Sequence, residues 1–293
     1  MSTRGRLAFT KLEALGNDFM LVDARQRAFS ADADSIRQAG DRRRGVGFDQ
    51  LLIVESPTET TSTCRVAIYN RDGSRAEQCG NGMRAIALWL ARGGEMKQRA
   101  TIETDAGPVS VYIDRSGMPG ATLGIPDFSP AACGISGSDR FPVELDIDGE
   151  TCSVLGASLG NPHLVVVCDT DPSREDLLRI GPALSRHPRL ANGANVGLAC
   201  PTGRGSIRLR VYERGAGATR ACGSGACAAA SVLIERGQVD SPVEVVQPGG
   251  RLVINWAGQG TPVSMSGPAR MVYQGFIEWP PTKSSPKNES SNG

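Results

Sequence analysis

The 293-residue chain has little net charge, few aromatic residues, only two histidines and no long apolar run. Its 32 basic and 31 acidic residues give a formal net charge of +1, which does not indicate a nucleic-acid or membrane surface. No stretch reaches the roughly 18 apolar residues of a membrane span, and no signal-peptide core follows the N-terminal arginines. We therefore expect a cytoplasmic protein with no nucleic-acid or membrane partner. The basic run at residues 42–44 is typical of a solvated turn.

The eight cysteines form no recognisable metal or redox motif. No two of them are spaced as C-x-x-C, so a zinc knuckle or a thioredoxin-type site is poorly supported. The chain length, the missing leader and the irregular spacing argue against a disulfide framework. We expect no metal site and expect most cysteines to be small buried apolar residues. The interesting cysteines are those placed where a thiol would be activated.

Short apolar runs separated by turn residues predict the strands of a mixed fold. They lie at 51–54, 65–68, 109–113, 164–167, 207–211 and 252–254. Helices are expected at 33–40, 80–91, 173–186 and 223–235, and the third begins with a capping-box-like segment from Ser173 to Asp176. Because strands and helices do not alternate regularly, an α+β fold is favoured over a parallel α/β sheet.

An internal repeat is the most informative feature of the chain. Residues 79–90 (CGNGMRAIALWL) align without gaps on residues 222–233 (CGSGACAAASVL), and six of the twelve positions are identical. The same offset of 143 maps Arg71 on Arg214. Two homologous domains are therefore expected, 1–124 and 125–269, joined by a Pro-, Gly- and Ser-rich stretch near 124–138. The polar tail 280–293 is expected to be disordered.

Each copy of the repeat places a cysteine before a Gly-x-Gly that begins a helix of small residues. A helix N-terminus carries free N–H groups and partial positive charge. A thiol there is expected to have its pKa lowered from about 8.5 to between roughly 3.5 and 7.5. The free N–H groups can also bind a carboxylate. One copy alone fits a glycine turn with an inert buried cysteine, whereas two copies favour a site.

Two such turns that face each other across a cleft would place Cys79 and Cys222 on opposite faces of one carbon. Inversion at an α-carbon needs a base on one face and an acid on the other. A thiolate and a thiol provide that pair and exchange roles in the reverse reaction. No pyridoxal cofactor is required, and no lysine motif for one is present.

Six blocks of the chain resemble a known family. Residues 70–84 (NRDGSRAEQCGNGMR) and 212–226 (YERGAGATRACGSGA) resemble the two signatures of the diaminopimelate epimerases. The blocks LGNDF (15–19), GVGFDQL (45–51), GNPH (160–163) and NVGL (195–198) also resemble this family, in its order, so the resemblance covers about 11–275. It implies two similar α+β domains, each a mostly antiparallel sheet around a central helix, with the site between them. It also implies a C-terminal strand near 270–279 that returns to the first domain.

The resemblance implies a cofactor-independent enzyme that interconverts L,L- and meso-2,6-diaminopimelate for lysine and cell-wall synthesis, and it allows a homodimer. By motif match Cys79 and Cys222 are catalytic, and His163 is an auxiliary residue that orients a thiol or a water. The residues implied to bind substrate are Asn17, Gln50, Asn70, Gly80, Asn81, Asn161, Asn195, Glu213, Arg214, Gly223 and Ser224.

Two alternatives remain open from the sequence. A related two-cysteine racemase of proline or hydroxyproline would need to hold only one carboxylate and a ring. Arg214, Glu213 and the asparagines favour a longer substrate with two zwitterionic ends. A dithiol redox or binding protein, in which Cys79 and Cys222 form a disulfide, is the second alternative.

Overall fold

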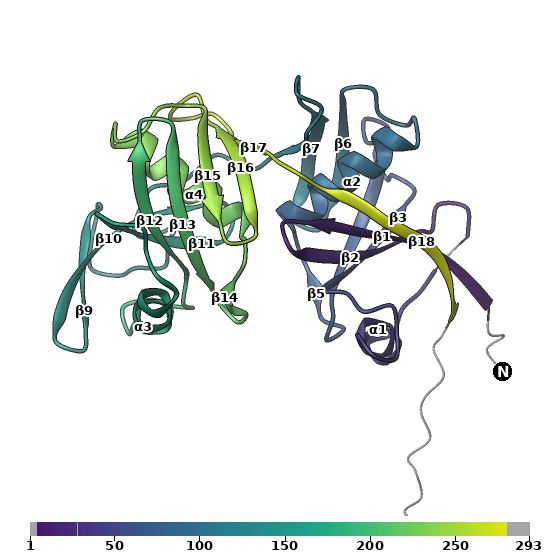
Figure 1. Cartoon of the computed structure of the whole chain (residues 1–293), viewed down its shortest axis with the longest axis horizontal. Helices are drawn as coiled ribbons and strands as arrows, with labels where there is room; N and C mark the ends of the chain where they lie inside the picture. The colour runs from purple at the N-terminus through teal and green to yellow at the C-terminus, as the bar shows by residue number, and fades with distance from the viewer. Residues whose placement is uncertain (1–4, 28, 280–293) are drawn as a thin grey trace, which may run out of the picture.

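The protein is described by a computed structural model that covers residues 5–27 and 29–279, so the tail 280–293 lies outside the described residues. Two lobes of strands each enclose one helix and carry a second helix on the outside (Figure 1). The four helices are α1 (Ala33–Gly40), α2 (Gly80–Arg92), α3 (Arg174–Ser185) and α4 (Gly223–Glu235). All four lie where the sequence predicts them, and the α+β fold class is confirmed.

The first lobe contains the first eight strands and the last one. Their bounds are β1 (Gly5–Ala14), β2 (Asn17–Asp23), β3 (Gln50–Glu55), β4 (Cys64–Asn70), β5 (Arg75–Ala76), β6 (Arg99–Thr104), β7 (Gly107–Ile113), β8 (Pro119–Thr122) and β18 (Arg270–Trp279).

The second lobe contains the strands between these. Their bounds are β9 (Val143–Ile147), β10 (Glu150–Ser158), β11 (Pro162–Val167), β12 (Asn195–Gly203), β13 (Ser206–Glu213), β14 (Gly217–Thr219), β15 (Val243–Gln247), β16 (Gly250–Asn255) and β17 (Ser264–Ser266).

The two lobes repeat the same strand pairings. In the first lobe β2 pairs parallel with β3 and β4 pairs parallel with β6. In the second lobe β11 pairs parallel with β12 and β13 pairs parallel with β15. The other pairings within the lobes are antiparallel, as in β3–β4 and β12–β13. The duplication seen in the sequence is therefore also a duplication of topology.

The lobes are joined by strand pairing as well as by chain connections. Strand β17 of the second lobe pairs with β8 of the first, with Met265 opposite Ala121. Strand β18 then returns to the first lobe and pairs with β1 along its whole length. The chain thus crosses between the lobes twice, once before β9 and once before β18.

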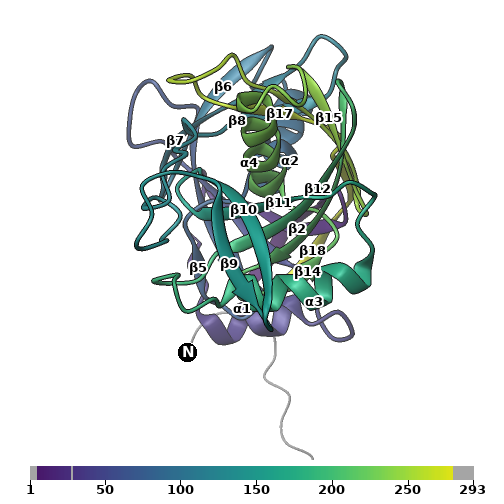
Figure 2. The same cartoon turned by 90° about the vertical axis from the view of Figure 1, so that its left-hand side faces the viewer.

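Helices α2 and α4 are the central helices of the two lobes. Small residues dominate α4, where the side chains of Ala226, Cys227 and Ala230 are fully buried, whereas α2 also buries larger side chains. Figure 2, which looks along the line between the lobes, shows the two helices behind one another inside the ring of strands. Both helices begin at the interface between the lobes, because Gly223 at the start of α4 lies beside Asn81 in the first turn of α2.

Helix α3 confirms its predicted start. The Ser173 side chain accepts a hydrogen bond from the Asp176 N–H, and the Asp176 carboxylate accepts one from the Ser173 N–H, which completes a capping box. None of the helices in the described ranges is long and apolar enough to cross a membrane.

Candidate active site

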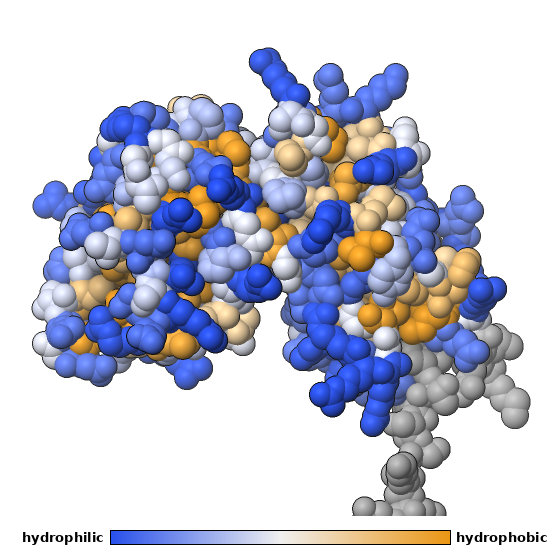
Figure 3. All heavy atoms as spheres, in the orientation of Figure 1, coloured by the Kyte–Doolittle hydropathy of each residue, from blue (hydrophilic) through white to orange (hydrophobic). Residues whose placement is uncertain are grey.

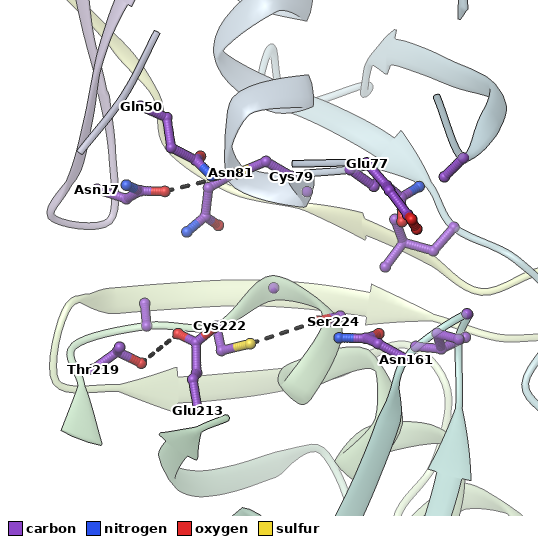
Figure 4. A pocket seen from close by; sticks show the side chains of 18 of the residues that line it. Asn17, Gln50, Glu77, Cys79, Asn81, Asn161, Glu213, Thr219, Cys222 and Ser224 are labelled. Carbon is purple, nitrogen blue, oxygen red and sulfur yellow. Dashed lines mark hydrogen bonds between the residues drawn. The ribbon is translucent and has the colours of Figure 1, made fainter. Parts of the chain in front are cut away.

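A cleft of about 1220 Å³ lies between the lobes and is lined by residues of both (Figure 4). Its walls include the first residues of α2 and α4 together with the β1–β2 turn and strand ends of each lobe. The predicted residues in these walls are Asn17, Gln50, Asn70, Cys79, Gly80, Asn81, Asn161, Glu213, Arg214, Cys222, Gly223 and Ser224. The structure therefore brings together residues that are up to 207 positions apart (17 to 224).

The two predicted cysteines occupy equivalent positions in the cleft. Cys79 is the N-cap of α2, and its sulfur accepts a hydrogen bond from the Gly82 N–H at 3.4 Å. Cys222 is the N-cap of α4, and its sulfur accepts one from the Gly225 N–H, also at 3.4 Å. A sulfur takes the place of the usual capping oxygen in both helices, so both sulfurs sit at the positive ends of helix dipoles.

The thiol pKa shifts run opposite to the expected lowering. Burial raises the pKa of Cys79 to about 11, although the Gly82 amide and the charge of Arg84 oppose the rise. The pKa of Cys222 is raised further, first by burial and then by the negative charge of Glu213. The free energy needed to remove a thiolate from water exceeds the stabilisation that the helix amides provide. Both thiols are therefore protonated at neutral pH until another positive charge enters the cleft.

The Cys79 thiol faces the amide of Asn17. The sulfur donates to Asn17 Oδ1 over 3.8 Å, and Asn17 Nδ2 donates to Asp49 Oδ2 at 3.2 Å. Arg42 in turn donates to Asp49 and, through both terminal nitrogens, to Asp18. Residues 42–44 form an exposed turn, as predicted, and from this turn the Arg42 guanidinium holds the carboxylates that support the Cys79 side of the site.

Glu213 and Ser224 surround the other thiol. Ser224 Oγ lies 3.6 Å from the Cys222 sulfur, and Thr219 donates to Glu213 Oε1 at 2.6 Å. Burial raises the pKa of Glu213. The backbone N–H of Cys222 donates to Gln247 Oε1 at 2.9 Å, which fixes the start of α4.

Two of the predicted residues lie behind the cleft wall and do not face it. Asn195 is buried, accepts the Arg214 N–H at 2.9 Å and donates to the Pro162 carbonyl, so it positions the backbone of Arg214. His163 is 2% exposed and its Nε2 lies 3.2 Å from Asn161 Oδ1. The predicted auxiliary role of His163 toward a thiol or a water is thus replaced in the structure by a contact with Asn161.

Several buried polar atoms in the cleft wall or behind it lack a partner among the described residues. Gln50 Nε2 donates to Asn70 Oδ1 at 3.0 Å, but Gln50 Oε1 has no donor. Asn81 Oδ1 and Gln247 Nε2 are also unpaired in residues 5–27 and 29–279. Buried polar atoms are normally satisfied, so the two oxygens are suited to accept hydrogen bonds from a bound ammonium group.

Sequence reasoning missed five residues that shape the site: Asp49, Glu77, Thr219, Gln247 and Met265. Asp49 and Glu77 lie inside the matched blocks, so their position was a usable signal. Met265 has no motif around it, and only the fold brings it against the two helix starts. Within the described ranges, no group of three or more His, Cys, Asp or Glu side chains is arranged to hold a metal ion.

A duplicated α+β fold with one cysteine at each of two adjoining helix starts is the architecture expected of an isomerase whose site lies between two homologous lobes. The family model of diaminopimelate epimerase matches residues 9–123 and 156–272. The diaminopimelate epimerases of Stutzerimonas stutzeri and Chromobacterium violaceum are each 42% identical, over 92% and 93% of this chain and 99% of their own. The chain therefore belongs to the diaminopimelate epimerase family and is an isomerase.

Solved structures with low sequence identity share the fold. A hydroxyproline epimerase from Agrobacterium vitis superposes with a TM-score of 0.69 at 13% identity, covering 95% of this chain and 93% of its own. A PhzF-family phenazine biosynthesis protein from Bacillus anthracis gives 0.63 at 17% identity, covering 93% and 99%. The two-lobed architecture is thus common to proteins that differ widely in sequence.

Proposed function

We propose that the protein interconverts L,L- and meso-2,6-diaminopimelate by moving one α-proton between Cys79 and Cys222. The observation that carries the proposal is the equivalence of the two thiols: each caps a central helix, and both helices begin in one cleft. The supporting comparison is the 42% identity to diaminopimelate epimerases over nearly the whole chain.

The helix starts provide the binding site for the reacting carboxylate. The first turns of α2 and α4 adjoin each other, and the glycines at 80 and 223 leave their amides open to the cleft. A carboxylate bound there accepts N–H groups from two helix N-termini. As the α-proton leaves, the negative charge that spreads onto this carboxylate is stabilised by dipoles already in place.

The proton transfer needs one thiolate and one thiol. The thiolate removes the α-hydrogen from one face, and the thiol S–H gives its proton to the opposite face, so the two sulfurs exchange protonation states. Because burial raises the pKa of Cys79 to about 11, the α-ammonium of the substrate supplies the positive charge that makes a thiolate accessible.

The far end of the substrate is assigned to the polar residues around Arg214. Its guanidinium is suited to bind a carboxylate as a fork, and it lies in the cleft wall, which also contains Arg75 and Arg220. Glu213 and the unpaired side-chain oxygens of Gln50 and Asn81 are the groups proposed to accept ammonium groups. This polar set serves a substrate with two amino-acid ends.

The test is deuterium exchange at the α-carbon of diaminopimelate in deuterated water under reducing conditions. We expect exchange and epimerisation by the parent, and a loss of about 10²–10⁴ in kcat for Cys79→Ser and Cys222→Ser. Cys152→Ser, on β10 and outside the cleft, is the matched control and should keep the parent rate. Unimpaired turnover in either site variant would exclude the two-thiol mechanism.

The same assay decides between this proposal and its alternatives. A hydroxyproline epimerase shares the fold, so proline and hydroxyproline are tested beside diaminopimelate. Exchange with proline alone would overturn the substrate assignment. A redox protein would have to cycle a Cys79–Cys222 disulfide, whereas an epimerase needs both thiols free, so turnover under reducing conditions separates the two.

We also propose a homodimer formed through β18, acting in the cytoplasm. Val272, Tyr273 and Phe276 of this strand are 54%, 47% and 61% exposed. Figure 3 shows an apolar patch on the right-hand lobe where this strand runs. Burying such a patch against a second copy would remove it from water. Sedimentation of the parent and of Phe276→Asp tests this: a dimer should become a monomer, and a parent monomer would contradict it.

A further inference from the structure

Arg84 is a fully buried arginine in the interior of the protein. Its exposure is 0%, and it lies on α2, five residues after Cys79. Its Nη1 donates to the sulfur of Met265 at 3.4 Å, while Nε and Nη2 have no hydrogen-bond partner within the described part of the chain. No carboxylate of the described residues forms a salt bridge with it. An unpaired buried charge is costly, so this arginine is not explained by stability.

Met265 separates the guanidinium from the two helix starts. A Cβ atom at Gly80 would lie 2.5 Å from the Met265 methyl, and one at Gly223 would lie 3.0 Å from it. The Met265 sulfur, which lies 3.0 Å from the same Cβ position at Gly223, accepts the Arg84 N–H. The positive charge therefore lies directly behind the pair of N-termini, one side chain away from the amides assigned to the carboxylate.

The buried arginine has no counterpart in the second copy of the repeat. The offset of 143 pairs Arg84 of α2 with Cys227 of α4, which is also fully buried. The second lobe thus has no arginine of its own at this position. Because α2 and α4 adjoin at their first turns, one guanidinium serves the helix starts of both lobes.

The groups that act electrostatically on Arg84 are Cys79, Cys227, Glu13 and Tyr112. Burial lowers the pKa of Arg84 to about 10, so it remains charged at neutral pH. Its charge lowers the pKa of both Cys79 and Cys227 against the effect of burial. Besides the helix amides, the Arg84 guanidinium is thus the protein group that lowers the pKa of Cys79 against the effect of burial.

We propose that Arg84 is a positioning residue for the proton transfer: its buried charge, behind Met265 and the two helix starts, favours the thiolate and the negative charge that develops on the carboxylate. This inference rests on the proposed function. Arg84 touches neither thiol nor substrate, so it acts through the field at the helix starts. In low-dielectric surroundings such a field is only weakly screened.

The direct test is Arg84→Met, which fills the space with an apolar side chain and removes the charge. We expect the acid limb of the pH profile of kcat/KM to move up by about one pH unit, and kcat/KM at pH 7 to fall about tenfold. Stability to urea should stay the same or rise, because apolar replacement of a buried charge is often neutral or stabilising. A purely structural arginine predicts the reverse: lower stability and an unmoved limb.

A second pair of variants leaves Arg84 in place. Cys227→Asp puts a carboxylate near the guanidinium and cancels its charge, whereas Cys227→Asn has the same shape without charge. We expect the acid limb to move up in the aspartate variant only. If the acid limb of the kcat/KM profile had the same apparent pKa in both variants, the proposal would be overturned. Arg92→Met, at the exposed end of the same helix, should leave the limb of the parent unchanged.

A readout without turnover separates this inference from the proposed function. The rate of Cys79 alkylation by iodoacetamide is followed against pH in a Cys222→Ser background, with and without Arg84→Met. The alkylation midpoint should rise by about one unit in the Arg84 variant. If diaminopimelate is not a substrate, this shift still stands; if the parent is active and neither midpoint nor limb moves, the inference about Arg84 fails.

Discussion

At the scale of single residues, the amide of Asn17 has two ends with different partners. Its nitrogen is anchored on Asp49, and its oxygen faces the Cys79 thiol. Without the carboxylate the amide can turn and present its N–H₂ to the sulfur, which already receives the Gly82 N–H. The carboxylate thus decides which end of the amide the thiol meets.

We expect Asp49→Ala to lower kcat by about 10- to 100-fold, because one hydrogen bond to a charged group is worth about 1.5–3 kcal/mol. Steady-state kinetics on diaminopimelate would measure this. Arg43→Ala, an exposed residue close to Arg42 in sequence, is the control and should behave as the parent. Full activity in Asp49→Ala would show that Asn17 does not need its anchor.

His163 gives the stability of the protein a predictable pH dependence. Burial, followed by the charge of Arg214, lowers the pKa of His163 to about 3 from an ordinary value of 6.5. As the pH falls, this histidine therefore takes up a proton in the unfolded chain at a higher pH than in the folded protein. The stabilisation is complete above about pH 6.5 and is lost as the pH falls from there toward 3.

At pH 5 the loss from this histidine is about 2 kcal/mol relative to pH 7.5. We expect His163→Gln, which retains a donor for Asn161, to lose less stability between those pH values than the parent does. Urea unfolding at pH 7.5 and pH 5 measures the difference. Parallel declines in both proteins would mean that His163 is not buried as a neutral group.

At the scale of elements, the two cysteine-capped helices differ in how tightly their first turns are packed. A Cβ at Gly82 would meet Leu52 at 3.4 Å and the Cys79 sulfur at 3.5 Å, which is ordinary contact. A Cβ at Gly225 would lie 3.2 Å from Val211 and 3.3 Å from the Cys222 sulfur. The equivalent positions of the repeat therefore have unequal room.

We expect Gly82→Ala to keep kcat within about threefold of the parent and Gly225→Ala to lower it by about tenfold or more, since small displacements of a catalytic group are costly. Circular dichroism should show both variants folded, because alanine favours helices. The comparison uses kcat for epimerisation in each direction. Equal effects of the two substitutions would contradict the difference in packing.

The elements themselves were largely predictable, for local reasons. Helix α3 has a cap and an amphipathic face, and α2 and α4 each follow a cysteine and Gly-x-Gly. Strands β3, β4, β7, β11, β13 and β16 contain the short apolar runs of the sequence. The pairing of β17 with β8 could not be predicted, because β17 has only three residues and no pattern of its own.

The position of the site was predictable where a sequence motif marked its residues. Properties that depend on burial, such as the thiol pKa values, were predicted wrongly. Cys79 and Cys222 stand in repeated motifs, and both line the cleft. The direction of their pKa shift was wrong, because the sequence shows a helix start but not the burial that outweighs it. Asn195 and His163 belong to matched blocks too, yet the sequence does not tell a residue that faces the cleft from one that supports it.

At the scale of the whole molecule, the cleft is wider than one amino acid requires. Its volume of about 1220 Å³ exceeds the roughly 300–1,000 Å³ of typical small-molecule sites. A carbanion-like centre also needs water excluded, since bulk water would supply protons to either face. The connections before β9 and before β18, together with the short β8–β17 pairing, join the lobes, so the lobes can turn about them.

We expect the lobes to close on a substrate analogue that carries a methyl group in place of the α-hydrogen. Small-angle scattering should show a smaller radius of gyration at saturating analogue than in the free protein. Alkylation of Cys79 and Cys222 should slow by about tenfold at ten times the dissociation constant, while Cys152, outside the cleft, reacts as before. Slower alkylation with an unchanged radius of gyration would mean that the ligand shields the thiols without closure, so the protein would have to exclude water by another route.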